Sequence, residues 1–262
     1  MSILDRFRVD DKVAVVTGAG RGIGAASAIA LAEAGADVAL TARSADQLEQ
    51  VAATIRGLGR RAFVYPGDVN DLEMLPAFVD ATVSELGRID IVVNNAGGSP
   101  PAAITDVTAR SFEAAFHFNV TTALVLTQAC IPQLVANHGN VVNISSMAGR
   151  TAARALTQYG VAKAALSHLT RYLATDLNPK VRVNAIAVGS TATSALETVL
   201  TMPEIRDAMI AATPLRFIGE PEDIAAGVLY LASPAARYVT GKVFEIDGGT
   251  ESSTLDIPIP DF

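Results

Sequence analysis

Lys12-Val-Ala-Val-Val-Thr-Gly-Ala-Gly-Arg-Gly-Ile-Gly24 is the most informative stretch of this chain. Its first half is a run of apolar and β-branched residues, which predicts a buried strand over 12–17. The second half is a glycine-rich turn that directly follows this strand. Glycines let the backbone turn sharply and approach a pyrophosphate at the N-terminus of the next helix. Because a glycine-rich turn can also be a purely structural loop, the rest of the chain has to support this interpretation.

Short apolar runs alternate with longer helical patterns along the whole chain. Each run is apolar through both faces, which indicates a parallel sheet covered by helices on both sides. Right-handed crossovers between such strands predict one doubly wound, Rossmann-like α/β domain over residues 1–262, with ligands at the carboxyl ends of the strands. The predicted strands are Lys12–Thr17, Asp37–Thr41, Ala62–Pro66, Ile89–Asn94, Gly139–Ile144, Val181–Ile186 and Lys242–Ile246.

Several helix ends carry recognisable signals. Ser44-Ala-Asp-Gln47 has the residues of a capping box, and Pro221 suits the first turn of a helix. Gly35 and Gly57 stand where helix C-caps are expected.

Composition narrows the class of protein. The 262 residues include 20 Gly and 12 Pro, and half of them are hydrophobic, as in an ordinary globular chain. With 27 acidic and 20 basic residues the net charge is −7, which argues against binding nucleic acid. The stretch Ala114–Gly149 lacks charges, but polar residues and a proline interrupt it, so we expect a buried or interface helix rather than a membrane span.

The cysteine and histidine content predicts no metal site and a cytoplasmic location. Cys130 is the only cysteine, so no intramolecular disulfide can form, and the first residues show no apolar signal core. His117, His138 and His168 show no ligand spacing with this cysteine or with a carboxylate cluster.

Three motifs occur at the expected strand ends. Gly18, Gly22 and Gly24 follow the pattern G-x-x-x-G-x-G, Asp68 follows the third predicted strand, and Asn94-Asn-Ala-Gly97 follows the fourth. Taken in this order, the motifs resemble those of the short-chain dehydrogenase/reductase family, and the resemblance covers about Lys12 to Gly249. It implies a nicotinamide cofactor, with Asp68 at the adenine. Each motif alone could be a capped turn.

Charge indicates which cofactor is bound. Enzymes of this architecture that prefer NAD place an acidic residue after the second strand to hold the ribose 2′-hydroxyl. Here Ala42 stands at that position, Arg43 follows it, and Arg21 lies in the glycine turn. Two guanidinium groups could meet a 2′-phosphate, so NADP(H) is predicted over NAD(H), although both arginines could also be solvated surface charges.

The catalytic residues are predicted from a spacing and its context. A Tyr four residues before a Lys on a helix puts both on one face, where the ammonium can lower the phenol pKa. Tyr159 and Lys163 have this spacing, and so do Tyr238 and Lys242. Tyr159 opens a long helical pattern, whereas Tyr238 precedes a glycine and a strand, so the second pair is interpreted as structural.

The family resemblance adds two further catalytic residues. Ser146 lies thirteen residues before Tyr159 and matches the serine that orients the substrate carbonyl. Asn119 matches a helix asparagine that holds a water connecting the lysine to solvent, although a mid-helix Asn can also be a polar kink. The resemblance implies hydride transfer, with Tyr159 as acid or base.

The resemblance also assigns cofactor contacts beyond the glycine turn. One departure occurs at Val188-Gly189, where the family usually has Pro-Gly, but Thr193 still falls where a threonine contacts the nicotinamide carboxamide. The predicted cofactor-binding residues are Gly18, Arg21, Gly22, Ile23, Gly24, Arg43, Ser44, Asp68, Val69, Asn95, Ala96, Gly97, Tyr159, Lys163, Val188, Gly189, Thr191 and Thr193.

Apolar residues suggest the kind of substrate. The segment 194–217 has apolar residues at helical spacing, where the family carries a substrate lid, although such residues more often serve packing. With Pro100–Ile104, Met147 and Leu156 they favour an apolar substrate, steroid-like or acyl, as a small-molecule carbonyl compound or alcohol.

Two alternatives remain. In a 3-oxoacyl-[acyl-carrier-protein] reductase a base would dock the carrier protein; Val135-Ala-Asn-His-Gly139 lacks it, though Lys180 could serve. The other alternative is a non-catalytic NADP(H)-binding sensor.

Resemblance and broad apolar helix faces predict a homotetramer. The tail 250–262 suggests an extended arm that reaches a neighbouring subunit, or a frayed end.

Overall fold

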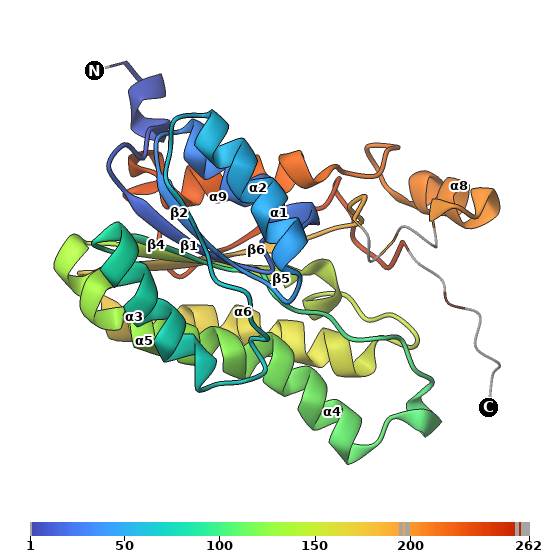
Figure 1. Cartoon of the computed structure of the whole chain (residues 1–262). Coiled ribbons are helices and arrows are strands. Elements are labelled where there is room, and N and C mark those ends of the chain that lie inside the picture. The colour runs from blue at the N-terminus through green and yellow to red at the C-terminus, as the bar shows by residue number, and fades with distance from the viewer. Residues whose placement is uncertain (1, 194–195, 197–199, 255–256, 258–262) are drawn as a thin grey trace.

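A parallel sheet of seven strands forms the centre of the computed structural model, which describes residues 2–193, 196, 200–254 and 257 (Figure 1). The strand order is β3-β2-β1-β4-β5-β6-β7, which confirms the predicted doubly wound sheet. The strands are β1 (Val13–Thr17), β2 (Asp37–Thr41), β3 (Ala62–Val64), β4 (Ile91–Asn94), β5 (Asn140–Ser146), β6 (Arg182–Val188) and β7 (Val243–Ile246). The fifth and sixth strands each run two residues beyond their predicted ends, to Ser146 and Val188.

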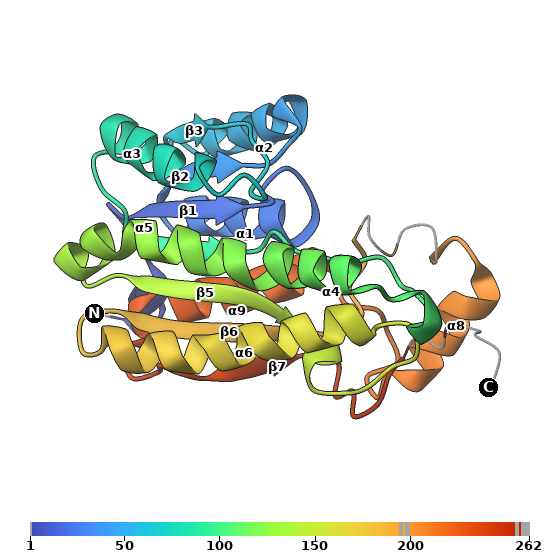
Figure 2. The same ribbon diagram turned by 90° about the horizontal axis from the view of Figure 1, so that it is seen from below.

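Helices cover both faces of the sheet (Figures 1 and 2). One face carries α1 (Gly22–Glu33), α2 (Ala45–Gly57) and α9 (Pro221–Ala232). The other carries α3 (Met74–Leu86), α5 (Thr122–Asn137) and α6 (Thr157–Leu177), with α4 (Ala109–Phe116) continuing into α5 through the π-helical turn η3 (His117–Thr121). Beyond the carboxyl ends of the strands lies α8 (Pro203–Ala212) (Figure 2). The short turns are η1 (Leu4–Phe7), η2 (Ile104–Asp106), η4 (Met147–Gly149) and η5 (Pro234–Ala236).

Alternation along β1 explains why its sequence is apolar throughout. Val16 packs into the core under α1 and α9, whereas Val15 packs into the core with Phe78 and Leu126 on the opposite face. Successive side chains of a strand point to opposite faces, and here both faces are covered. Burying one such valine stabilises the fold by about 1.5–3 kcal/mol.

The helix ends mostly follow the predicted signals. Ser44 caps α2 and accepts a hydrogen bond from the Gln47 amide, and Pro221 is the first residue of α9. Gly35 follows the end of α1 with a left-handed φ of 110°. The predicted C-cap at Gly57 is wrong: this residue is still helical, and Gly59, with a φ of 77°, makes the turn.

The helical stretch Ala109–Asn137 is long and apolar enough to cross a membrane by length and composition. The core helix of a globular protein meets the same criteria. Its residues Leu126, Cys130 and Leu134 are buried in the core beside the sheet. This arrangement agrees with the buried helix expected from the sequence.

Strand order places a crevice between β1 and β4. The chain proceeds from β1 to β2 on one side and reaches β4 on the other, so connections leave the sheet in opposite directions at this point. Ligands of doubly wound folds bind at such a reversal, beyond the carboxyl ends of the strands.

Candidate active site

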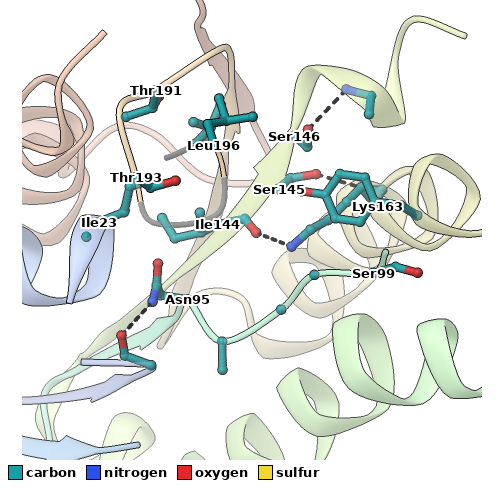
Figure 3. A pocket seen from close by; sticks show the side chains of 18 of the residues that line it. Ile23, Asn95, Ser99, Ile144, Ser145, Ser146, Lys163, Thr191, Thr193 and Leu196 are labelled. Carbon is teal, nitrogen blue, oxygen red and sulfur yellow. Dashed lines mark hydrogen bonds between the residues drawn. The ribbon is translucent and has the colours of Figure 1, made fainter. Parts of the chain in front are cut away.

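A cavity of about 1030 Å³ opens at the carboxyl ends of the strands (Figure 3). It is lined by residues from the glycine turn, from the ends of β2, β4, β5 and β6, and from α6. The structure brings every predicted catalytic and cofactor-binding residue to this cavity wall except Gly24 and Asn119. Both exceptions lie directly behind the wall.

The glycine turn holds the first strand against the first helix. Gly18 and Gly22 have φ angles of 62° and 55°, a region that disfavours any side chain. A Cβ atom on Gly24 would lie only 2.2 Å from the Gly18 carbonyl oxygen. Gly24 therefore forms the close contact between helix and turn, and its contact with the cofactor stays a prediction.

Thr17 connects this turn to the segment after β4. Its hydroxyl oxygen accepts hydrogen bonds from the amides of Asn95 and Ala96, both at 3.0 Å. The Asn95 side chain in turn donates to the Thr17 carbonyl at 2.9 Å and to the Gly18 carbonyl at 3.2 Å. Sequence reasoning missed Thr17, although a hydroxyl at the end of a buried strand beside the turn was a usable signal.

The far end of the cavity is cationic. Ala42 follows β2, and Arg43 and Arg21 are exposed at the cavity wall. Within the described residues, neither guanidinium pairs with a carboxylate. Both are therefore available to an anionic ligand group.

Two polar residues at this end already have partners. Ser44 caps α2, and the Asp68 carboxylate accepts hydrogen bonds from the backbone amide and the side chain of Asn70, both at 3.0 Å. The alternative interpretation of Asp68, as the capping residue of a turn, is thus correct for one carboxylate oxygen. Val69 and Ser44 also line the cavity.

These features fit a nicotinamide dinucleotide. The first amides of α1 have no intrahelical acceptor, and the N-cap residue Arg21 supplies no side-chain bond to them. Positive partial charge at this helix end and glycines at the turn suit a pyrophosphate. Thr193 lies above the turn, with its methyl group 3.4 Å from where a Cβ of Gly22 would stand.

Ser146 and Tyr159 both line the cavity. Ser146 is the last residue of β5, and Tyr159 lies in the first turn of α6. The neighbouring Ser146 side chain lowers the pKa of the Tyr159 hydroxyl, but burial outweighs this and leaves the pKa raised above its usual value. Tyr159 therefore keeps its proton at neutral pH in this structure.

Lys163 lies one helical turn beyond Tyr159 and is buried. Its Nζ donates to the Ile144 carbonyl at 2.8 Å and stands 5.7 Å from the centre of the Tyr159 ring (Figure 3). Burial lowers the pKa of Lys163 to about 8. The lowering of the Tyr159 pKa expected from the ammonium is not seen here, because desolvation dominates.

Asn119 lies in the π-helical turn η3 and is 1% exposed. Its Nδ2 donates to the carbonyls of Ala115 at 2.8 Å and Gly98 at 2.9 Å, and its Oδ1 accepts from the Gly98 amide at 2.9 Å. A Cβ on Gly97 would lie 2.7 Å from Asn119 Oδ1 and 2.9 Å from Lys163 Nζ. Asn119 is thus a polar kink in the helix, which was the alternative interpretation from the sequence. It also lies beside Lys163.

Ser145, which the sequence did not single out, holds α6 against β5. Its hydroxyl donates to the Lys163 carbonyl at 3.0 Å and lies 2.7 Å from the Ser167 hydroxyl. Adjacent strand residues point to opposite faces, so Ser145 supports the helix while Ser146 faces the cavity. The Ser-Ser pair in the sequence was the available signal.

The substrate end of the cavity is largely apolar. Pro101, Met147 and Leu156 line it as predicted, whereas Ile104 is 52% exposed and does not line it. From the predicted lid, Leu196, Ile205 and Met209 contribute to the wall; residues 194–195 and 197–199 of that lid lie outside the described residues. The carboxyl-terminal residues Ser253, Thr254 and Ile257 also line the cavity, while 255–256 and 258–262 of the predicted arm are not described.

The second Tyr-x-x-x-Lys pair lies away from this site. Tyr238 is fully exposed after η5, and neither it nor Lys242 lines the cavity. Gly241 between them has a φ of 69°, so the segment is a turn rather than a helix. The structural interpretation of this pair is confirmed.

Comparisons with known proteins agree with the geometry. Residues 18–251 match a family model described as enoyl-(acyl carrier protein) reductase. An uncharacterized oxidoreductase of Mycobacterium tuberculosis is 51% identical over 99% of both chains, and the 7alpha-hydroxysteroid dehydrogenase of Escherichia coli K12 is 42% identical over 94% of this chain and 96% of its own. A solved 7alpha-hydroxysteroid dehydrogenase, complexed with NADH and 7-oxo glycochenodeoxycholic acid, superposes with a TM-score of 0.91 at 41% identity, covering 95% of this chain and 98% of that one.

Proposed function

Because the chain belongs to the short-chain dehydrogenase/reductase family, whose members are nicotinamide-dependent oxidoreductases acting on CH–OH groups, we propose that it interconverts an apolar ketone and a secondary alcohol with NADP(H). The proposal rests on one observation. Ser146, Tyr159 and Lys163 line the same cavity as the glycine turn and the N-terminus of α1, which suit a dinucleotide. When bound, the nicotinamide ring supplies or accepts the hydride.

Tyr159 is the proton donor for reduction and the acceptor for oxidation in this proposal. Its raised pKa keeps the hydroxyl protonated at neutral pH, as an acid requires. Ser146, which lines the same cavity at the end of β5, orients the carbonyl oxygen. The donor and the orienting group thus line one cavity.

Lys163 supports Tyr159 from behind. Its ammonium favours the phenolate that forms as the proton leaves, and its position at the cavity wall lets it contact the nicotinamide ribose. Asn119 acts as a positioning residue, because its side chain fixes Gly98 and lies beside Lys163.

Charge supports NADP(H) as the cofactor. Ala42 offers no carboxylate to hold or repel a ribose substituent, while Arg43 and Arg21 reach the same end of the cavity. The solved relative named above holds NADH, so this preference is proposed from the residues of this chain.

The substrate is proposed to be steroid-like or acyl. Met147, Leu156, Ile205 and Met209 form an apolar wall, which suits an extended hydrophobic ketone better than a sugar. Similarity to hydroxysteroid dehydrogenases supports the steroid class. A carrier-protein-bound acyl substrate is the competing class, supported by the description of the matching family model.

Cofactor consumption tests the proposal directly. NADPH and NADH are offered in parallel with steroid ketones, β-ketoacyl thioesters, small diketones and quinones. We expect NADPH-selective turnover of the steroid ketones that collapses in Tyr159→Phe. Turnover of thioesters alone would move the function to the acyl class. Tight NADPH binding without turnover of any compound would favour the non-catalytic sensor.

The fold and surface support three further proposals. We propose a single domain with a substrate lid near 194–217, a cytoplasmic location consistent with the one buried thiol, Cys130, and a homotetramer. Large apolar side chains are exposed on α4, α5 and α6, at Phe116, Val135, Val161 and Tyr172. Such faces suit subunit contacts, and light scattering of the purified chain would measure the assembly directly.

A further inference from the structure

The segment that follows β7 folds back against the site. It leaves the sheet at Asp247, whose backbone lies 2.4 Å from where a Cβ of Gly189 would stand. The Asp247 carboxylate then accepts the amide of Gly249 at 2.9 Å, and the Thr250 hydroxyl donates to the Asp247 carbonyl at 2.7 Å. Thr250 is 1% exposed, so this turn is packed rather than frayed. We call residues 247–254 the carboxyl-terminal strap.

Arg150 fastens the strap to the loop that carries Ser146. It follows η4, which begins one residue after Ser146, and its guanidinium donates to the Thr250 carbonyl. The same group pairs with Asp247 at 3.4 Å, with Glu251 at 2.8 Å and with Glu245 of β7 at 3.2 Å. The Glu251 carboxylate is exposed and contributes little, whereas the Asp247 carboxylate is buried and also accepts the backbone amides of Gly249 and Thr250.

A second fastening lies at the other end of the strap. The Thr254 hydroxyl lies 2.7 Å from the Ser190 hydroxyl, directly after the Val188-Gly189 loop. Thr254 is 7% exposed, yet it lines the cavity together with Ser253 and Ser190. The strap therefore joins two loops that both border the reacting groups, and α8 lies at the same end of the molecule (Figure 1).

We propose that the carboxyl-terminal strap, fastened by Arg150 and by the Ser190–Thr254 contact, is a substrate-specificity wall of this subunit's own site. The wall selects extended apolar ketones, because Thr254 lines the same cavity as the apolar residues Ile205 and Met209. This inference rests on the proposed function for the kind of substrate. It places residues 247–254 over their own cavity, whereas the sequence suggested an arm to a neighbour.

Equilibrium binding tests the wall without relying on turnover. Calorimetry measures the Kd of 7-oxo glycochenodeoxycholic acid, the keto steroid named with the solved relative, for protein saturated with NADP⁺, which cannot reduce it. We expect Arg150→Gln to raise this Kd about tenfold and Thr254→Val to raise it about fivefold, as fixed hydrogen bonds are lost. The Kd of NADPH should change less than about twofold in both, because the helix end and glycine turn are untouched.

Arg8→Gln is the matched control, since Arg8 makes an exposed pair with Asp10 outside the cavity. Equal weakening of keto steroid and NADPH in both strap variants would show a merely structural role and overturn the inference. Unchanged steroid binding in both variants, or no steroid binding by the wild-type protein, would overturn it as well. If the wild-type protein binds the steroid yet reduces no ketone with NADPH, the proposed function fails while the wall is still decided by the ratio of Kd values.

Discussion

The two ends of the cavity differ in the kind of atoms that line them. At the nucleotide end the wall is backbone: glycines with positive φ angles, a helix N-terminus and strand ends held by Thr17. At the substrate end the wall consists of side chains on segments outside the sheet, including Ile205, Met209 and Thr254. The first end depends on chain geometry, and the second depends on packing between loops.

This difference separates what the fold requires from what the substrate requires. Sheet register fixes the nucleotide end, because β1 pairs with both β2 and β4 and the turn after it has little freedom. The substrate end is fixed by a few hydrogen bonds, such as those of Arg150 and Thr254. Changes there are expected to alter selectivity while leaving the cradle intact.

The largest expected effect is on the rate of the reaction, without a change at either end of the cavity. Tyr159→Phe keeps the ring but removes the proton donor, so we expect kcat to fall about a thousandfold. The Kd of NADPH should stay within about twofold, because the glycine turn and the helix N-terminus that suit the pyrophosphate are unchanged. Tyr238→Phe is the matched control, since that fully exposed tyrosine has the same spacing to a lysine. A similar loss in both variants would disprove the assignment of Tyr159.

The next largest effect tests the backbone wall with two neighbouring glycines. A Cβ on Gly24 would lie 2.2 Å from a carbonyl oxygen, so Gly24→Ala should lower the free energy of unfolding by about 3 kcal/mol. A Cβ on Gly22 meets only Thr193 at 3.4 Å, so Gly22→Ala should cost about 1–2 kcal/mol, from its left-handed φ alone. Urea unfolding measures both. Equal losses would mean that conformation, not close approach, limits this turn.

The same contrast explains how far the sequence could predict this protein. Residues tied to strand ends or to the Tyr-x-x-x-Lys spacing, such as Ser146 and Tyr159, were found because local pattern and sheet order fix their positions. The close approach of Gly24 to Gly18 could not be foreseen, because a motif gives spacing but no atomic distances. Arg150 was missed, since its partners lie about a hundred residues away and are joined to it only by folding.

Electrostatics were harder to foresee than positions. The Tyr159–Lys163 spacing predicted a lowered tyrosine pKa, but burial of both side chains proved the larger effect in this structure. Desolvation depends on the whole cavity, which a four-residue motif does not describe.

A smaller effect concerns the cationic end of the nucleotide wall. We expect Arg43→Ala to lower kcat/KM for NADPH about tenfold, the lower value for a charged hydrogen bond, because Arg43 is exposed. The value for NADH should not change, which makes the ratio the informative measurement. Arg56→Ala, at an exposed arginine of α2 outside the cavity, is the control. An unchanged cofactor ratio would assign Arg43 to the solvated surface.

The smallest expected effect is a pH dependence of ketone reduction that arises from Lys163. Lys163 has a pKa of about 8, so its amine is protonated and charged well below that pH and loses its charge as the pH rises through that value. Ketone reduction by NADPH should therefore fall about fourfold between pH 7 and pH 8.5, in proportion to the charged fraction. Tyr159 contributes no loss over this range, because its pKa is raised and it stays protonated.

Lys163→Arg identifies the group responsible for that decline. An arginine remains charged throughout this range, so whatever activity the variant retains should lack the alkaline decline. If the decline persists unchanged, it belongs to another group, and the ammonium is not required for proton transfer. If the decline disappears while the Kd of NADPH is preserved, the charge of Lys163 acts on proton transfer by Tyr159. It then has no part in binding the cofactor at the nucleotide end of the cavity.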